Sequence, residues 1–153
     1  MRKTLLIFGI AGLLFSGCAT TPTKHVTGYS ASAGDKAAGT ALTMIGRPYH
    51  FKGETPSGFD CSGLVRYSYL TAGMDVPHST GALKNGTRSV GLKNARKGDL
   101  LFFVQEGKKY SHVGIYVGDD KFIHAPSTGG HVRKDSITDP YWKKHYLDTR
   151  RFF

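Results

Sequence analysis

A lone cysteine that heads a predicted helix is the residue of this sequence best suited to chemistry. Cys61 follows a turn at 55–58 and Asp60, and apolar residues then recur at helical spacing until Gly73. Asp60 is a good N-cap, so the pattern predicts a helix that begins at Cys61. The helix dipole there favours a thiolate and keeps the sulfur near a surface, which makes Cys61 a candidate nucleophile. The alternative is that Cys61 is a small buried core residue.

Two histidines could supply the partners that a cysteine nucleophile needs. Such a thiol requires a base to take its proton, and the base requires a neighbour that fixes its ring. His112 begins a predicted strand at 112–117, and His124 lies in a return strand at 121–125. On the two arms of one hairpin, both side chains can lie on one sheet face near the helix end. The alternative for each is a structural histidine.

Metal binding is the other common use of cysteine and histidine. Zinc sites show short paired ligand spacings. The sequence holds only two cysteines, Cys18 and Cys61, and no such spacing. We therefore expect no metal and no cofactor.

The remaining pattern places helices first and an antiparallel sheet afterwards. The segment 49–58 is expected to be a loop that leads into the Cys61 helix and carries substrate contacts. This order, in 153 residues, predicts one domain of α+β fold in which helices pack on an antiparallel β-sheet. The expected elements are helices at 35–45 and 61–72, a short helix ending near 85, strands at 100–104, 112–117, 121–125 and 131–133, a helical turn at 141–144 and a strand at 147–152.

The first residues have the character of an export signal. Arg2 and Lys3 precede an apolar run at 5–15, which is too short to span a bilayer. The run ends in Ser-Gly-Cys18 and resembles a bacterial lipobox, in which the cysteine is lipidated. We therefore expect a lipoprotein signal peptide at 1–17, a lipidated tether at 18–34 and one domain at 35–153. A Cys18–Cys61 disulfide is the alternative in an oxidising compartment.

The chain is strongly basic. Its formal net charge is +10, and removal of Arg2 and Lys3 with the signal leaves +8. A basic surface favours an anionic partner, and cell wall or phospholipid head groups fit an exported protein. Nucleic acid is disfavoured because the sequence shows no nucleic-acid module. The alternative is that the charge serves only solubility.

Several ordered motifs resemble the NlpC family of bacterial cell-wall cysteine peptidases. The similarity runs from about residue 37 to the C-terminus, and its last segment, 140–151, is similar to envelope lipoproteins of that family. The resemblance implies a papain-like core with the catalytic cysteine at a helix N-terminus. The motifs that carry it are Gly46-Arg47-Pro48-Tyr49, Asp60-Cys61-Ser62-Gly63-Leu64-Val65, Gly98-Asp99-Leu100, Ser111-His112-Val113-Gly114-Ile115-Tyr116 and Phe122-Ile123-His124-Ala125.

The resemblance also implies roles for single residues. Cys61 would be the nucleophile, His112 the general base and His124 the polar residue that orients His112. Tyr49 matches a tyrosine whose hydroxyl lies near the oxyanion.

Two further matches and two departures concern the substrate. Asp60 and Ser62 match positions that help to bind the stem peptide of peptidoglycan. His78 stands where the family often has arginine, and the glutamine that commonly follows is missing. Lys52 precedes Gly53 where paired glycines are common. Both departures concern specificity more than chemistry.

The predicted function is therefore a peptidoglycan endopeptidase that acts next to diaminopimelate. The D-alanyl cross-link is the first choice of bond and the D-glutamyl bond the second, because the C-terminal segment is similar to lipoprotein members of the family that act as murein endopeptidases. Arg47, Lys52, Arg66 and His78 are expected to rim the groove and bind stem carboxylates, which favours such a substrate over a neutral peptide. A cysteine acyltransferase, a non-catalytic wall-binding module and a structural lipoprotein are the alternatives. We expect a monomer anchored by lipid in the cell envelope, at the outer membrane facing the periplasm, since the residue after Cys18 is not acidic.

Overall fold

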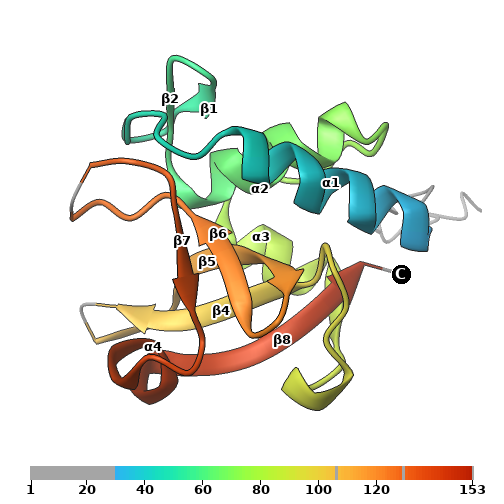
Figure 1. Ribbon diagram of the computed structural model, residues 1–153, viewed down its shortest axis with the longest axis vertical. Coiled ribbons are helices and arrows are strands. Elements are labelled where there is room, and N and C mark those ends of the chain that lie inside the picture. Colours follow the sequence, from blue (N-terminus) through green and yellow to red (C-terminus); the bar gives the residue numbers. More distant parts are fainter. Residues whose placement is uncertain (1–29, 106, 129, 153) are drawn as a thin grey trace, which may run out of the picture.

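A six-stranded antiparallel sheet forms the centre of the molecule and carries helices on both faces (Figure 1). The computed structural model describes residues 30–105, 107–128 and 130–152. The sheet order is β3-β8-β4-β5-β6-β7, and a small hairpin, β1-β2, precedes the second helix. The elements are α1 (Ala31–Thr43), β1 (Glu54–Thr55), β2 (Gly58–Phe59), α2 (Cys61–Thr71), α3 (Thr80–Asn85), β3 (Thr87–Ser89), the 3-10 helix η1 (Leu92–Asn94), β4 (Leu100–Gln105), β5 (Lys108–Gly118), β6 (Lys121–His124), β7 (Arg133–Ser136), α4 (Pro140–His145) and β8 (Tyr146–Phe152).

Helix α1 packs against α2 through small side chains. Ser30 caps it by accepting a hydrogen bond from the Ala33 amide, and alanines at 37, 38 and 41 are buried. Alanine at helical spacing lets two helices approach closely, so α1 lies along α2 over the sheet (Figure 1). The predicted helix at 35–45 exists but begins at Ala31 and ends at Thr43. The last residues of the segment assigned to the tether, 31–34, are therefore helical.

Strand β4 is buried on both faces because it lies between two hydrophobic cores. Leu100 and Phe102 belong to the larger core under α1, α2 and α3. Leu101 and Phe103 point the other way, into a smaller core closed by Trp142 of α4. Side chains alternate across a strand, so one continuous apolar run serves both cores.

A buried ion pair ties the beginning of β4 to the end of β8. The Arg151 guanidinium donates from Nε to Asp99 Oδ1 and from Nη2 to Asp99 Oδ2, each at 2.7 Å. Asp99 also accepts from the Arg96 amide. Removal of one partner of such a pair leaves a buried charge uncompensated, so both residues support the fold.

The predicted α+β arrangement is confirmed, and the strands that the prediction missed are very short. The prediction missed β1, β2 and β3, which have two or three residues each and no apolar alternation. The strand predicted at 131–133 is β7 and runs from Arg133 to Ser136, where its partner β6 sets the register. The expected signal peptide at 1–17, the lipidation site Cys18 and the tether up to residue 29 lie outside the described residues.

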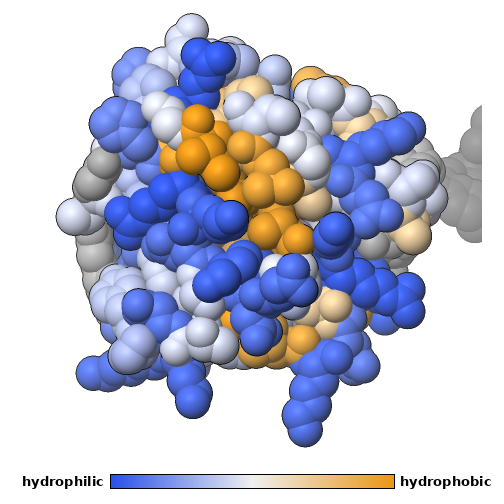
Figure 2. Space-filling model, in the orientation of Figure 1, coloured by the Kyte–Doolittle hydropathy of each residue, from blue (hydrophilic) through white to orange (hydrophobic). Residues whose placement is uncertain are grey.

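The surface is mostly polar. Figure 2 shows a hydrophobic area in the middle of one face, with hydrophilic residues around it. Among the described residues, no helix has both the length and the apolar character needed to cross a bilayer.

Candidate active site

The first turn of α2 holds Cys61 in a fixed position. The Asp60 side chain caps the helix by accepting a hydrogen bond from the Gly63 amide at 2.6 Å, and it also accepts from the Ser62 hydroxyl at 3.0 Å. Gly63 must be glycine, because a Cβ there would lie 1.9 Å from the Gly53 carbonyl oxygen. The N-terminus of α2 therefore packs directly against the loop before β1. The helix begins at Cys61, as predicted.

Cys61 is a free thiol, partly exposed, beside strand β5. The backbone amides of Val113, Ser62 and Cys61 itself act on the sulfur and lower its pKa. Burial and then the negative charge of Asp60 act more strongly and raise the pKa of the Cys61 thiol to about 11. The helix N-terminus and these amides therefore do not by themselves hold Cys61 as a thiolate, and the predicted nucleophile depends on a neighbouring base to take its proton.

The hydrogen bond from the Val113 amide locates the Cys61 sulfur next to β5, at the point along this strand where its neighbour β6 ends. The pairing of Ile115 with Ile123 would set Val113 opposite residue 125, one position past the end of β6. The Val113 amide is thus not used by β6 and is free to bond the sulfur. The backbone of Val113, the residue that follows His112 in the chain, therefore reaches the sulfur of Cys61.

His112, His124 and Asp135 form a buried line of hydrogen bonds, which we call the histidine array. His112 Nε2 lies 2.9 Å from His124 Nδ1. His124 Nε2 lies 3.0 Å from Asp135 Oδ2. The two histidines are 3% and 0% exposed, and both contact the Trp142 ring. The predicted pair of histidines on one sheet face is therefore present.

Burial keeps both rings neutral. It lowers the pKa of His112 to about 3, and the neighbouring His124 and Arg133 lower it further while Asp135 opposes them. Burial also lowers the pKa of His124, against the hydrogen bond to Asp135. A neutral imidazole is the state in which His112 can accept a proton.

Sequence reasoning missed Asp135. Its Oδ2 accepts from His124 Nε2, from Arg133 Nε at 3.0 Å and from Trp142 Nε1 at 2.9 Å. The available signal was strand alternation: in β7, Arg133 pairs with His124 and Asp135 with Phe122, so both lie on the face of His124. The predicted strand ended at residue 133, two positions too early to include Asp135.

Tyr49 lies beside the nucleophile. Its amide donates to the Gly130 carbonyl at 2.6 Å, and a parallel bridge joins it to Phe59. Burial raises the pKa of the Tyr49 hydroxyl, and the charges of Cys61 and Asp60 add to the effect. Lys52, which follows in this loop, has a φ of 58°. Paired glycines suit this place because the left-handed conformation is easiest for glycine.

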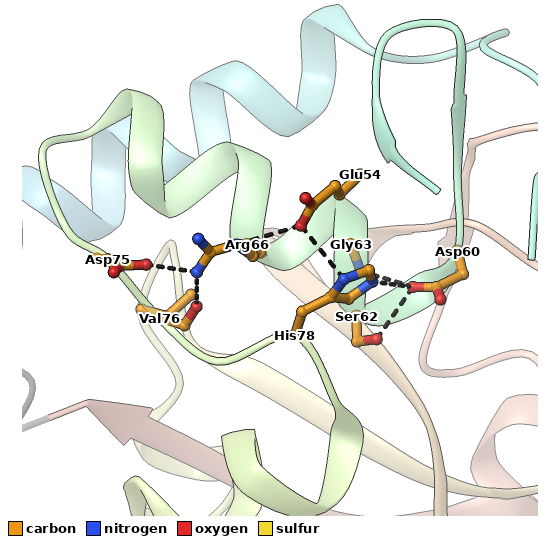
Figure 3. A network of polar contacts seen from close by, with 8 residues as sticks. All are labelled: Glu54, Asp60, Ser62, Gly63, Arg66, Asp75, Val76 and His78. Carbon is orange, nitrogen blue, oxygen red and sulfur yellow. Dashed lines mark hydrogen bonds and ion pairs between the residues drawn. The ribbon is translucent and has the colours of Figure 1, made fainter. Parts of the chain in front are cut away.

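A second polar cluster lies on the other side of Asp60, and we call it the helix-end network: Glu54, Asp60, Arg66, Asp75 and His78 (Figure 3). His78 lies between two carboxylates, with Nδ1 3.2 Å from Glu54 Oε2 and Nε2 3.2 Å from Asp60 Oδ1. Arg66 points from α2 to Glu54, at 3.2 Å, and to Asp75. It also donates to the Val76 carbonyl.

These contacts change the interpretation of the basic rim. Arg66 and His78 were expected to bind carboxylates of the substrate, but carboxylates of the protein already occupy both side chains (Figure 3). The carboxylates of the network therefore compete with a substrate for both side chains. Arg47 and Lys52 remain as candidates for that contact.

Comparison with known proteins agrees with this geometry. The family model described as "NlpC/P60 family" matches residues 46–151. Murein DD-endopeptidase MepH of Escherichia coli K12 is 36% identical over 115 residues, which are 72% of this chain and 42% of that protein. The bifunctional muramidase/DL-endopeptidase CwlT of Bacillus subtilis strain 168 is 37% identical over 114 residues, 72% of this chain and 34% of that protein. The chain thus spans less than half the length of these two relatives.

One solved structure is similar to this chain over almost the whole of its own length. The NlpC/p60 domain of peptidoglycan hydrolase SagA is 36% identical, with a TM-score of 0.65, and the match covers 78% of this chain and 98% of that one. The residues matched by the family model, 46–151, include the helix that carries Cys61 and the strands that carry both histidines. The chain belongs to the NlpC/P60 family.

Proposed function

We propose that this protein is a cysteine peptidase that hydrolyses peptide bonds in the stem peptides of peptidoglycan. The observations that carry the proposal are Cys61 at the N-terminus of α2, with the Val113 amide on its sulfur, and the hydrogen bond that joins His112, the residue before Val113, to His124. Relatives named as murein endopeptidases and a neighbour named as a peptidoglycan hydrolase support the substrate class.

The proposed mechanism assigns one step to each group. The Cys61 sulfur attacks the carbonyl carbon as His112 takes its proton, and the Tyr49 hydroxyl stabilises the oxyanion. His112 then donates that proton to the leaving amine, and the peptide bond breaks to leave a thioester on Cys61. Water, deprotonated by His112, attacks the thioester and releases the acid and the free thiol. His124 orients His112 throughout.

We propose the D-alanyl cross-link next to diaminopimelate as the bond that is cut. The relative named as a DD-endopeptidase supports this choice, and the relative named as a DL-endopeptidase supports the D-glutamyl bond as the second candidate. Asp60 and Ser62 border the nucleophile, and in the described part of the chain every hydrogen bond to the Asp60 carboxylate goes to Oδ1. The second oxygen can therefore contact a stem peptide.

Digestion of purified muropeptides tests both the activity and the bond. A DD-endopeptidase converts cross-linked dimers into intact monomers, whereas a DL-endopeptidase shortens monomers at D-glutamate. We expect the first pattern by mass spectrometry, and none with Cys61→Ala. Shortened monomers with persistent dimers would transfer the proposal to the second bond. A product in which an added amine replaces water would instead indicate an acyltransferase.

We also propose that the protein acts as a monomer anchored by lipid on Cys18 in the outer membrane, facing the periplasm. The lipobox-like Ser-Gly-Cys18 and the following polar segment support the anchor. Mature protein is expected in the membrane fraction, and Cys18→Ala is expected to make it soluble or leave it unprocessed. Unlipidated wild-type protein free in the periplasm would contradict the anchor.

A further inference from the structure

Asp135 has no role in the mechanism above, although it ends the histidine array. We propose that Asp135 is a positioning residue whose carboxylate fixes the tautomers of both histidines, so that Nδ1 of His112 is the nitrogen left without a proton. This inference rests on the proposed cysteine peptidase function, but its first test needs no substrate.

The direction of the hydrogen bonds follows from the carboxylate at the end of the line. The hydrogen bond from His124 holds the pKa of Asp135 well below its usual range, so its carboxylate is ionised and can only accept. His124 must then donate from Nε2, and a neutral ring has only one N–H. Its Nδ1 is therefore an acceptor.

The same reasoning passes to the next ring. Since His124 Nδ1 accepts, His112 must donate to it from Nε2 across the 2.9 Å contact. The neutral His112 ring then has its lone pair on Nδ1. That nitrogen is the one the array does not use, so it is free to take the thiol proton. Without Asp135 the two rings could exchange donor and acceptor roles.

The contacts around Asp135 suit a positioning role. Three N–H groups, from His124, Arg133 and Trp142, donate to the same oxygen, Oδ2. The Trp142 ring also packs against both imidazoles, at 4.8 Å from His124 and 5.7 Å from His112. These contacts hold the carboxylate in one orientation. Its negative charge also offsets the positive charge that His112 gains when it takes the proton.

Other charged groups surround Asp135, so several groups besides Asp135 influence the pH at which His112 and His124 take up protons. Arg133 and Lys134 lie on β7, Lys121 lies on β6 and Asp139 caps α4. Together with Asp135 and Trp142 they line a pocket of about 430 Å³. Asp139 provides a matched control, because it bonds the Tyr141 amide of the helix that carries Trp142 but makes no contact with His124 in the described structure.

The first test measures tautomers directly. Nitrogen-15 NMR of the imidazole rings at neutral pH should show both His112 and His124 protonated at Nε2 in the wild type. Asp135→Ala removes the acceptor and should give mixed tautomers. Asp135→Asn keeps a carbonyl acceptor and should restore most of the wild-type pattern. His124 protonated at Nδ1 in the wild type, or unchanged rings in Asp135→Ala, would overturn the proposal.

The second test measures reactivity. Alkylation of Cys61 by iodoacetamide should slow about 10- to 100-fold in Asp135→Ala, by analogy with the loss of a partner that orients a metal-bound histidine. Muropeptide kcat should fall similarly with little change in KM, and the acidic limb of the profile should move to lower pH, because the carboxylate raises the pKa of both histidines. A purely structural role predicts equal losses in Asp135→Ala and Asp139→Ala without a shifted limb, and that result would refute the assignment.

The two tests separate this inference from the proposed function. Wild-type protein that cleaves no muropeptide but shows the expected tautomers would refute the peptidase and leave the role of Asp135 intact. If Asp135→Ala fails to fold, the wild-type tautomers and the Asp135→Asn alkylation rate decide the question.

Discussion

The histidine array and the helix-end network lie near the same nucleophile and use similar groups in different ways. In the array, His112 and His124 are buried, and the three ring nitrogens that make its hydrogen bonds have one partner each. In the network the side chains are 14–47% exposed, and carboxylate oxygens are shared: Glu54 Oε2 serves both Arg66 and His78 (Figure 3). The array is therefore directional, whereas the network is redundant.

Exposure to solvent explains this difference. A buried hydrogen bond that loses its partner leaves an unsatisfied polar atom, so each contact in the array matters. An exposed ion pair is screened by water and can be replaced by it, so single contacts in the network contribute little. We expect changes in the array to act on kcat and changes in the network to act on KM.

The largest expected effect comes from the two residues that exchange the proton. Cys61→Ser and His112→Ala should each abolish muropeptide cleavage, with losses of about 10⁴-fold or more by analogy with other catalytic triads. The double variant should lose no more than either single one, because the two residues act as a unit. Circular dichroism provides the folding control. Wild-type cleavage by Cys61→Ser would contradict the assignment of the nucleophile.

A smaller loss is expected at His124. His124→Ala should retain residual activity, about 10²-fold below wild type, because His124 orients the base without itself transferring the proton. The effects of His124→Ala and Asp135→Ala should not add, since Asp135 acts through His124. Additive losses would show that Asp135 works by another route.

Burial of the array also predicts how stability changes with pH. His112 and His124 have lowered pKa values in the folded state, so the unfolded chain binds protons first as the pH falls. Their contribution is fully present above the ordinary histidine pKa of about 6.5 and is lost progressively below it. Between pH 7 and pH 5 we expect the free energy of unfolding to fall by about 2 kcal/mol through His112 alone.

Urea denaturation at the two pH values measures this loss. His112→Phe should reduce the change in the free energy of unfolding between pH 7 and pH 5. His50→Gln, at an exposed position, should leave that change as it is in the wild type. An equal slope in wild type and His112→Phe would show that another group is responsible.

The smallest effect is expected in the helix-end network. His78→Gln should raise KM by a few-fold and leave kcat within about twofold of wild type, because partly exposed ion pairs contribute about 0–1 kcal/mol. Glu54→Gln should behave similarly, because both changes weaken the contacts through which Glu54 and His78 hold the Asp60 side chain in place. Muropeptide titrations measure both constants. A loss in kcat as large as that of His124→Ala would mean that the network and the array do not differ as described.

The sequence predicted the catalytic elements well because their signals are local. A cap, a helical apolar pattern and a glycine stop marked α2, and alternation around a turn marked β5 and β6. The strands β1, β2 and β3 gave no such signal because they are short and their pairing partners, not their residues, make them strands. The helix dipole favours a thiolate at Cys61, whereas burial and the charge of Asp60 raise the pKa of the thiol.

The sequence by itself determined that Cys61 heads a helix and that His112 and His124 share a hairpin, since capping, spacing and strand alternation are properties of neighbouring residues. Only the tertiary structure decided which groups complete these elements. The register of β7 on β6 and the docking of Trp142 bring Asp135 to His124, and the packing of Gly63 on Gly53 brings the Glu54 loop to His78. Such contacts join residues far apart in sequence, and they exist only once the sheet has paired and the cores have packed.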